Sequence, residues 1–170
     1  MSWRVSRRFI APHEPPAPHS FRQSVWSGLS GAAAIAVVGV LTWWTKSPLL
    51  AASLGSTAFL IFGESENHAS QPRNVLGGYL ICACIGLAAG HGLGTTITSQ
   101  AIAVGLSIVA MEATRTIHPP AAGAALLATM GPTTIPGLLL PIMGGSAVLI
   151  AVALLLNNVL PERRYPQYWY

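Results

Sequence analysis

Two long uncharged stretches constrain the fold of this chain more than any other feature. Residues 75–111 and 116–161 contain no Asp, Glu, Lys or Arg. A helix rises about 1.5 Å per residue, so about 20 apolar residues cross a hydrocarbon core about 30 Å thick. Charged residues are 8% of the 170 residues and hydrophobic residues 52%, a balance that soluble domains do not show. The sequence therefore predicts an all-α integral membrane protein.

The apolar segments differ in length, and their order repeats. Two of them begin at proline, at Pro48 and at Pro119–Pro120, and are too short for an upright crossing. The order long, short, long occurs twice, which predicts a helical bundle of two repeats, residues 25–93 and 97–160. The long segments are 25–44, 75–92, 97–111 and 138–160, and the short ones are 49–62 and 119–130.

The positions of the cations favour one of two topologies. Three crossings in each half would make the repeats inverted, and six crossings with both termini inside would place all eight arginines inside and Lys46 outside. Four spans with two re-entrant helices would move Arg73 and Arg115 outside, although that topology suits the segment lengths better. We expect six segments, a membrane domain at 25–160, and cytoplasmic tails at 1–24, lying at the membrane interface or frayed, and at 161–170.

Several functional classes find no support in the sequence. The net charge is +4, but the cations are not grouped with aromatic residues as in a nucleic-acid-binding surface. The chain has no nucleophile elbow, Walker loop, H-E-x-x-H motif or paired carboxylates in an apolar segment, so we expect neither an enzyme nor a cofactor. Cys82 and Cys84 lie on different faces of a helix and have no cluster of His or carboxylates beside them, so neither a disulfide nor a metal site is expected.

His118 is the strongest candidate for a functional residue. It precedes Pro119 and Pro120, and proline is favoured at the first position of a helix. The start of a helix leaves backbone N–H groups unpaired and carries partial positive charge, which suits a small anion. A histidine also changes charge near neutral pH, so His118 is expected to contact substrate or carry a proton, and replacing it with Ala should reduce uptake. The alternative is a structural residue that fixes the entry of the chain into the helix.

Transporters with inverted repeats place their sites between the repeats, where short helices point their ends at the substrate. Arg73 and Arg115 could attract an anion there, or could simply anchor the protein by the positive-inside rule. Hydroxyls of the first short segment could bind the solute, or could bond to the backbone of a membrane helix. The predicted substrate-binding set is His118, Pro119, Pro120, Arg115, Arg73, Ser53, Ser56 and Thr57.

The segment His-Pro-Pro-Ala-Ala-Gly-Ala at 118–124 resembles the signature of the HPP family of membrane proteins. The similarity extends to residues 71–74, 111–116, 157–158 and 163–166. The resemblance implies a small bacterial or plastid membrane protein, and it implies nitrite transport because chloroplast members carry nitrite across the inner envelope. We therefore expect a transporter of a small monovalent anion, nitrite, in the bacterial inner membrane.

Two other functions remain open. One is a channel-like pore for a small neutral or weak-acid solute, and the other is a scaffold or sensor subunit that transports nothing. A homo-oligomer is expected in either case, because a chain of 170 residues has few helices with which to enclose a path. The small residues at 27–34 and the pairs Gly77–Gly78 and Gly144–Gly145 suit self-association. The number of subunits, the coupling ion and the direction of transport are not readable from the sequence.

Overall fold

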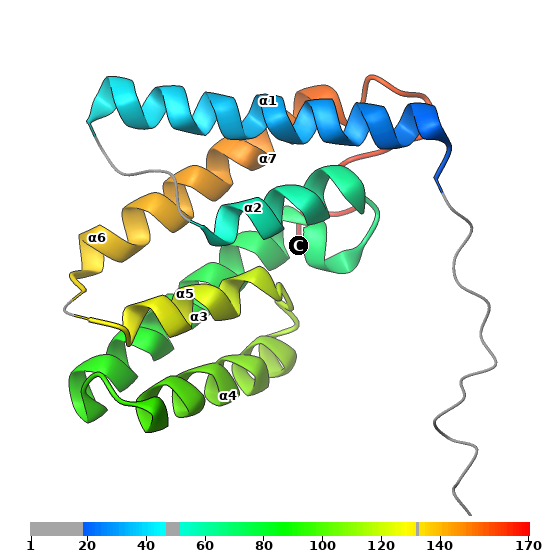
Figure 1. The fold of residues 1–170 in the computed structure, drawn as a ribbon. Helices are drawn as coiled ribbons and strands as arrows, with labels where there is room; N and C mark the ends of the chain where they lie inside the picture. The colour runs from blue at the N-terminus through cyan, green and yellow to red at the C-terminus, as the bar shows by residue number, and fades with distance from the viewer. Residues whose placement is uncertain (1–18, 47–51, 132) are drawn as a thin grey trace, which may run out of the picture.

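The computed structural model describes residues 19–46, 52–131 and 133–170, and within these ranges it contains helices and loops but no strand (Figure 1). The parts of the predicted tail and first short segment at 1–18 and 47–51 lie outside the described residues. The α-helices are α1 (Phe21–Thr45), α2 (Ser53–Ala58), α3 (Pro72–Leu93), α4 (Ile97–Thr114), α5 (Pro120–Ala128), α6 (Ile135–Leu139) and α7 (Gly145–Leu156). Shorter turns are the π-helical Phe59–Gly63 and Leu140–Gly144 and the 3-10 turn His68–Ser70.

The prediction of four long apolar segments is confirmed. In the part of the chain that the structure describes, four helices are long and apolar enough to cross a membrane: α1, α3, α4 and the continuous helical stretch Ile135–Leu156. The two short segments are also helical. The first short segment, Ser53–Gly63, has 11 residues: 6 in α2 and 5 in the π-helical turn that follows it. The second short segment, α5, has 9 residues. The short segments therefore need neighbouring helices, or further chain at their ends, to complete a crossing.

Successive segments run in alternating directions along the bundle (Figure 1). The Arg73 guanidinium donates to the Thr114 carbonyl at 3.2 Å, so the start of α3 lies beside the end of α4. The Trp26 indole N–H donates to the Leu156 carbonyl at 3.0 Å, so the start of α1 lies beside the end of α7. This alternation agrees with six segments rather than with re-entrant ones. That the two halves are related as an inverted repeat stays a prediction.

The alternation gathers the charges at one end of the bundle, which we call the charge-bearing end. Lys46 is the exception among the described charged residues, because it follows α1 at the opposite end. The charge-bearing end is where the positive-inside rule would place the cytoplasm. The charged residues at this end are Arg22, Glu64, Glu66, Arg73, Glu112, Arg115, Glu162, Arg163 and Arg164.

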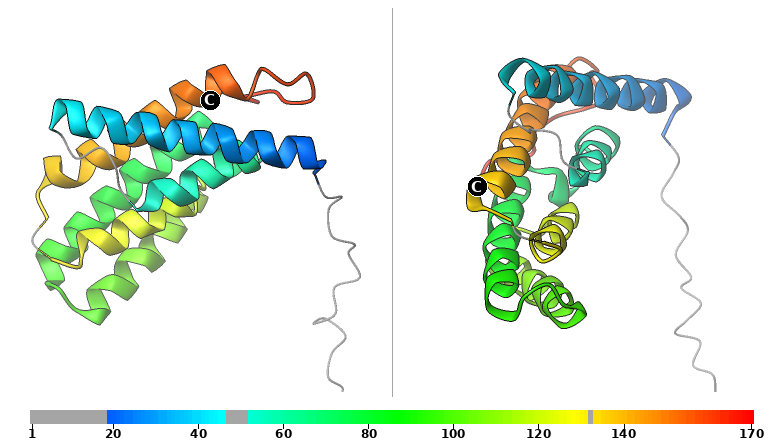
Figure 2. Two further views of the ribbon diagram at one scale, coloured as in Figure 1. Left: turned by 45° about the horizontal axis from the view of Figure 1, so that its top comes forward. Right: turned by 60° about the vertical axis from the view of Figure 1, so that its left-hand side comes forward.

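Helix α3 packs most extensively against α5 and α4, and Figure 2 shows it between α1 at one edge of the molecule and α4 at the other. Its glycines permit this close approach. A Cβ on Gly86 would lie 2.6 Å from the Ala125 carbonyl oxygen, and one on Gly78 would lie 2.9 Å from the His118 Cβ. The pair Gly77–Gly78 therefore serves packing within the chain, and our assignment of this pair to self-association was wrong. Sequence patterns of small residues do not distinguish the two kinds of helix contact.

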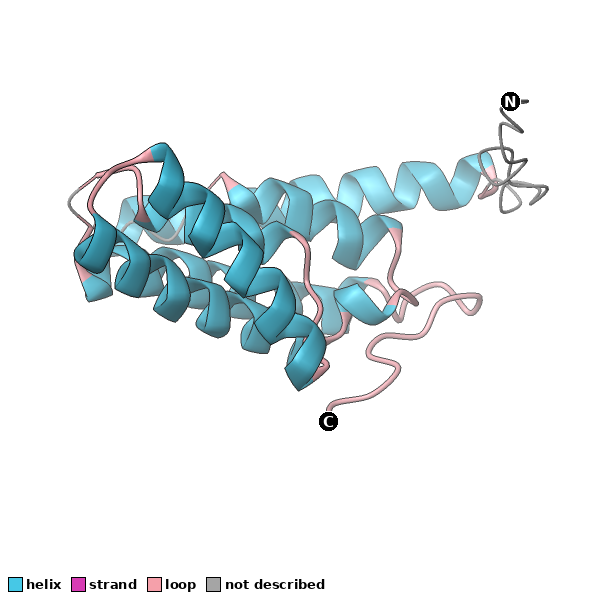
Figure 3. Ribbon diagram, turned by 90° about the horizontal axis from the view of Figure 1, so that it is seen from below, coloured by secondary structure: helices cyan, strands magenta, loops and turns pink. Residues whose placement is uncertain are grey.

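The last helix ends at Leu156, four residues before the predicted boundary, because asparagines follow it. The Asn157 amide donates to the Ile61 carbonyl at 2.8 Å, and the Asn158 side chain accepts the Tyr165 N–H at 3.0 Å. The Tyr165 hydroxyl in turn donates to the Ser70 carbonyl at 2.9 Å. Residues 161–170 thus fold back along the charge-bearing end, as Figure 3 shows, instead of extending away from it.

Candidate functional site

A chain of buried polar side chains joins α2, α3 and the start of α5. The imidazole Nε2 of His118 lies 2.9 Å from the Thr57 hydroxyl, which lies 2.7 Å from the Tyr79 hydroxyl. The other ring nitrogen, Nδ1, lies 2.7 Å from the Ala69 carbonyl oxygen. All three side chains have 0% exposure. A polar network buried in an apolar bundle is costly to leave unpaired, so this one fixes the relative positions of three helices.

The hydrogen-bonding capacities of these groups determine which atoms donate. A backbone carbonyl can only accept, so His118 Nδ1 carries a proton and donates to Ala69. In the neutral ring Nε2 is then an acceptor, and the Thr57 hydroxyl donates to it at 2.9 Å, the Ser53 carbonyl at 3.2 Å being the more distant acceptor of the same hydroxyl. With its proton used, the Thr57 oxygen accepts from the Tyr79 hydroxyl. The network therefore runs from Tyr79 through Thr57 and His118 to Ala69.

Burial keeps the imidazole neutral. It lowers the pKa of His118 to about 4, while the bond to the Ala69 carbonyl raises this pKa and only partly offsets the effect. At pH 7 the ring in this arrangement is therefore uncharged. A proton on Nε2 would also require the Thr57 hydroxyl to turn away. In this conformation His118 is not a cation that could bind an anion by charge.

The start of α5 is occupied by its own hydrogen bonds. His118 lies two residues before the first helical residue, as predicted, but Pro119 and Pro120 have no N–H groups. The Ala121 N–H donates to the His118 carbonyl at 2.9 Å, and the Ala122 N–H donates to the Pro119 carbonyl at 3.1 Å. The predicted use of free N–H groups at this helix start to hold an anion is therefore wrong. The tight turn that begins the helix uses the N–H groups that follow the prolines.

Ser53 and Ser56 meet the two prolines in a pocket between α2 and α5, which we call the serine pocket. Its volume is about 380 Å³, and none of the described residues that line it is charged. The two helices approach closely, since a Cβ on Gly123 would lie 3.7 Å from the Ser53 Cβ. Ser56 is exposed, so the pocket opens at the outer surface of the chain. The lining residues are Ala52, Ser53, Ser56, Pro119, Pro120, Gly123, Leu126, Leu127 and Met130.

The two predicted arginines lie in a different pocket, the arginine pocket, at the charge-bearing end. Its volume is about 530 Å³. Arg73 donates to the carbonyls of Thr114 at 3.2 Å and Arg115 at 3.3 Å, so it caps the end of α4. Arg115 itself adopts a left-handed backbone, φ 56°, at this helix end. The lining residues are Asn67, His68, Ala69, Arg73, Asn74, Glu112, Arg115, Ile117, Tyr168 and Tyr170.

His118 stands between the two pockets. Ile117, before it, lines the arginine pocket, whereas Pro119, after it, lines the serine pocket. Its two hydrogen-bond partners also lie on opposite sides. Ala69 lines the arginine pocket, and Thr57 is the neighbour in sequence of Ser56, which lines the serine pocket. The predicted residues thus form two groups rather than one site, and His118 and Thr57 line neither pocket.

Two members of the network were missed from the sequence. Tyr79 sits in the uncharged span 75–92, where a hydroxyl has to find a partner, and that requirement was a usable signal. Ala69 contributes only its backbone carbonyl, and no side-chain pattern could have identified it.

The comparisons with known proteins agree with the membrane fold. The family model described as HPP, transmembrane region, matches residues 16–166. A transmembrane protein of Dictyostelium discoideum is 32% identical over 157 residues, which cover 85% of this chain and 50% of the relative. A second transmembrane protein of that organism is 29% identical over 168 residues, which cover 92% of this chain and 59% of the relative.

This chain therefore spans between 50% and 59% of the length of these curated relatives. No solved structure matches it significantly. The family model covers all of the helices and the whole serine pocket, while Tyr168 and Tyr170 of the arginine pocket lie beyond the matched residues. The chain belongs to the HPP family of transmembrane proteins.

Proposed function

We propose that this protein transports a small monovalent anion, with nitrite the substrate that the family resemblance implies. The observation that carries the proposal is the position of His118, whose ring nitrogens contact Ala69 of the arginine pocket and Thr57, the neighbour of Ser56 in the serine pocket. We infer that the path joins these two solute-sized spaces and that His118 closes it in this conformation. The gate opens when the bond between His118 and Thr57 breaks.

Each part of this path has a physical task. Arg115 is exposed in the arginine pocket and raises the local concentration of anions at the charge-bearing end. The hydroxyls of Ser53 and Ser56 replace part of the hydration shell of the anion between the short helices. By the positive-inside rule we propose that the charge-bearing end faces the cytoplasm, and from the family resemblance that the host membrane is a bacterial inner membrane.

The serine pocket is open on one side, which bears on the oligomeric state. Ser56, Gly123 and Met130 are exposed in the single chain. A path that is lined on one side by α2 and α5 needs a second surface to exclude lipid. We therefore propose a homo-oligomer in which neighbouring copies complete the path.

One observation favours a second candidate, a pore for a neutral or weak-acid solute. No charged group is present among the described residues that line the serine pocket, and a neutral molecule passes such a region at a lower desolvation cost than an ion. Nitrous acid, the protonated form of nitrite, would then be the transported species.

The test is uptake of nitrite, nitrate, formate and chloride into liposomes that contain the purified protein, with and without a pH gradient. Saturable nitrite flux is expected. Ser56→Phe fills the serine pocket and should abolish that flux. Ala101→Phe adds the same ring at an exposed position of α4, away from both pockets, and should leave flux unchanged.

The outcomes separate the candidates. Flux that saturates with nitrite at fixed pH supports anion transport, whereas flux that follows the concentration of the protonated acid alone supports the neutral pore. Flux that Ser56→Phe leaves intact would place the path elsewhere. No flux of any of the four solutes would refute transport of these solutes and favour a scaffold or sensor subunit.

A further inference from the structure

A groove of about 560 Å³ runs along α1, on the side that faces α2 and the π-helical turn Phe59–Gly63. On the α1 side, which we call the α1 wall, each helical turn contributes one residue or a pair of residues to the lining of the groove, and most of them are small. Gly28 and Gly55 have nothing within 4 Å of a Cβ built on them, so the space beside them is open. The α1 wall consists of Ser24, Ser27, Gly28, Gly31, Ala32 and Ile35.

The length of the groove matches one leaflet of a bilayer. At about 1.5 Å per residue, the distance along α1 from Ser24 to Ile35 is about 16 Å. Half of a hydrocarbon core about 30 Å thick is about 15 Å. The groove starts at the charge-bearing end, where His19 and Glu64 line it, and stops near the middle of α1. It therefore has the depth of an acyl chain that belongs to the leaflet on that side.

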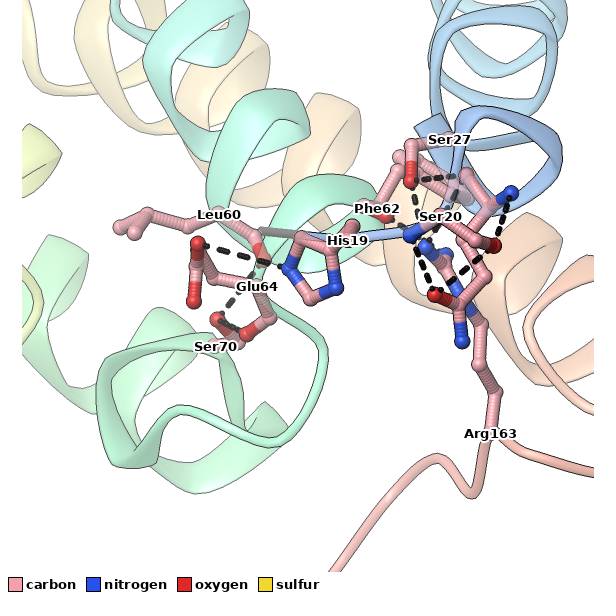
Figure 4. Close-up of polar contacts among 9 residues, drawn as sticks. His19, Ser20, Ser27, Leu60, Phe62, Glu64, Ser70 and Arg163 are labelled. Carbon is pink, nitrogen blue, oxygen red and sulfur yellow. Dashed lines mark hydrogen bonds and ion pairs between the residues drawn. The ribbon is translucent and has the colours of Figure 1, made fainter. Parts of the chain in front are cut away.

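The groove opens at the charge-bearing end into a polar pocket of about 300 Å³, which we call the polar mouth. His19, Gly63 and Glu64 line both spaces, so the two adjoin. Figure 4 shows His19 directed toward Glu64, with its Nε2 3.9 Å from the carboxylate. The mouth is lined by His19, Gln23, Gly63, Glu64, Ser65, Glu66, Glu162 and Arg163.

The charges of the polar mouth are unequal. Three carboxylates, Glu64, Glu66 and Glu162, face one guanidinium, that of Arg163, and one imidazole, that of His19 beside Glu64. This guanidinium already donates to protein acceptors, including the Phe62 carbonyl at 2.8 Å and the Ser27 hydroxyl, as Figure 4 shows. The carboxylates therefore carry the uncompensated charge, and they favour a cationic group that donates hydrogen bonds.

We propose that the groove and the polar mouth together bind one phospholipid with an amine headgroup, its acyl chain along α1 and its ammonium group among the carboxylates of the mouth. An apolar channel one leaflet deep that ends in an acidic polar pocket matches the shape and charge of such a lipid. The same charges disfavour an anionic phospholipid, which a basic pocket would prefer.

A second copy of the chain is the other occupant to consider, because small residues on α1 suit helix packing. A symmetric pair formed through this face with parallel chains would place two acidic mouths side by side at one end. Like charges in a partly desolvated contact oppose that arrangement. The depth of the groove and its polar mouth favour the lipid.

The experiment is native mass spectrometry of the purified full chain in detergent, with added phosphatidylethanolamine, phosphatidylcholine or phosphatidylglycerol. We expect one phosphatidylethanolamine to bind at least about fivefold more tightly than phosphatidylglycerol, the ratio that one elementary charge near a membrane surface gives. Gly28→Leu fills the groove and should abolish this binding. Gly39→Leu is the matched control, because Gly39 lies on the same helix with open space around it and does not line the groove.

A second pair of substitutions tests the headgroup. Glu64→Gln combined with Glu162→Gln leaves the groove intact and should remove the preference for the amine lipid. Preferential binding of phosphatidylglycerol by the unmodified chain would overturn the proposal, as would phosphatidylethanolamine binding that survives Gly28→Leu. A lipid-independent dimer that Gly28→Leu dissociates would also overturn it, in favour of a second copy in the groove.

Discussion

Replacing Thr57 with Val tests the direction of the buried hydrogen-bond network. The substitution keeps the shape of the side chain and removes its hydroxyl, which donates to His118 Nε2 at 2.9 Å and accepts from the Tyr79 hydroxyl at 2.7 Å. The imidazole acceptor then loses its partner, and the phenol keeps only its hydrogen bond with the Ser53 side chain. Tyr79→Phe, in contrast, removes the first donor of the series and leaves the bond between Thr57 and His118 in place.

The expected free energies follow from the number of orphaned groups. An unsatisfied buried polar group costs about 1–3 kcal/mol and a lost hydrogen bond about 1 kcal/mol, so Thr57→Val should destabilise the protein by about 2–4 kcal/mol. Tyr79→Phe loses one hydrogen bond and orphans no donor, which costs about 1 kcal/mol. Adding Tyr79→Phe to Thr57→Val removes a phenol that has already lost its bond to Thr57, so the two costs should not add and the double variant should be about as stable as Thr57→Val alone.

The assay is reversible unfolding in mixed micelles, followed by circular dichroism, with the free energy of unfolding compared across the three variants. Thr129→Val is the control, because Thr129 is equally buried and its hydroxyl donates locally to the Leu126 carbonyl at 2.7 Å. It should cost about 1 kcal/mol. The assigned direction is refuted if Tyr79→Phe is as destabilising as Thr57→Val, or if the double variant is less stable than Thr57→Val.

Three further predictions concern packing, pH and the charge-bearing end. Gly86→Ala should destabilise the protein by more than about 2 kcal/mol in the same unfolding assay, because its Cβ would lie 2.6 Å from a backbone oxygen of α5. Gly92→Ala on the same helix meets open space and should be neutral or stabilising. The pKa of His118 falls from 6.5 in the unfolded chain to about 4 in the folded one. The neutral imidazole therefore makes its full contribution to the free energy of unfolding above pH 6.5, and this contribution decreases by about 3 kcal/mol as the pH is lowered from 6.5 to 4. An unfolding midpoint that does not fall over this interval would contradict that burial. Arg163→Gln should lower the free energy of unfolding by about 2–3 kcal/mol, because the guanidinium donates to carbonyl and hydroxyl groups of α1 and of the turn after α2. Arg163→Lys should retain only part of this stability, because an ammonium group lacks the planar fork of the guanidinium. Equal stability of these two variants would contradict that role.

The membrane class and the positions of the helices could be predicted from the sequence because both depend on local properties. A segment crosses a bilayer according to its own length and hydropathy, so α1, α3 and α4 begin and end within four residues of the predicted limits. Proline at a helix start and glycine or asparagine at a helix end act through their own backbone and near neighbours. The position of His118 before α5 was predictable for the same reason.

The site depended on contacts between residues distant in the sequence, and these only the tertiary structure decided. Arg73 is 41 residues from the carbonyl that it caps, and His118 is 61 residues from Thr57, so no local pattern indicates that either pair meets. The division of the predicted residues into an arginine pocket and a serine pocket follows from the crossing of α5 over α3, which the α3 glycines permit. Hydropathy records which segments leave water, but it carries no information on which faces of the helices meet. That information lies in shape and hydrogen-bond complementarity across the bundle.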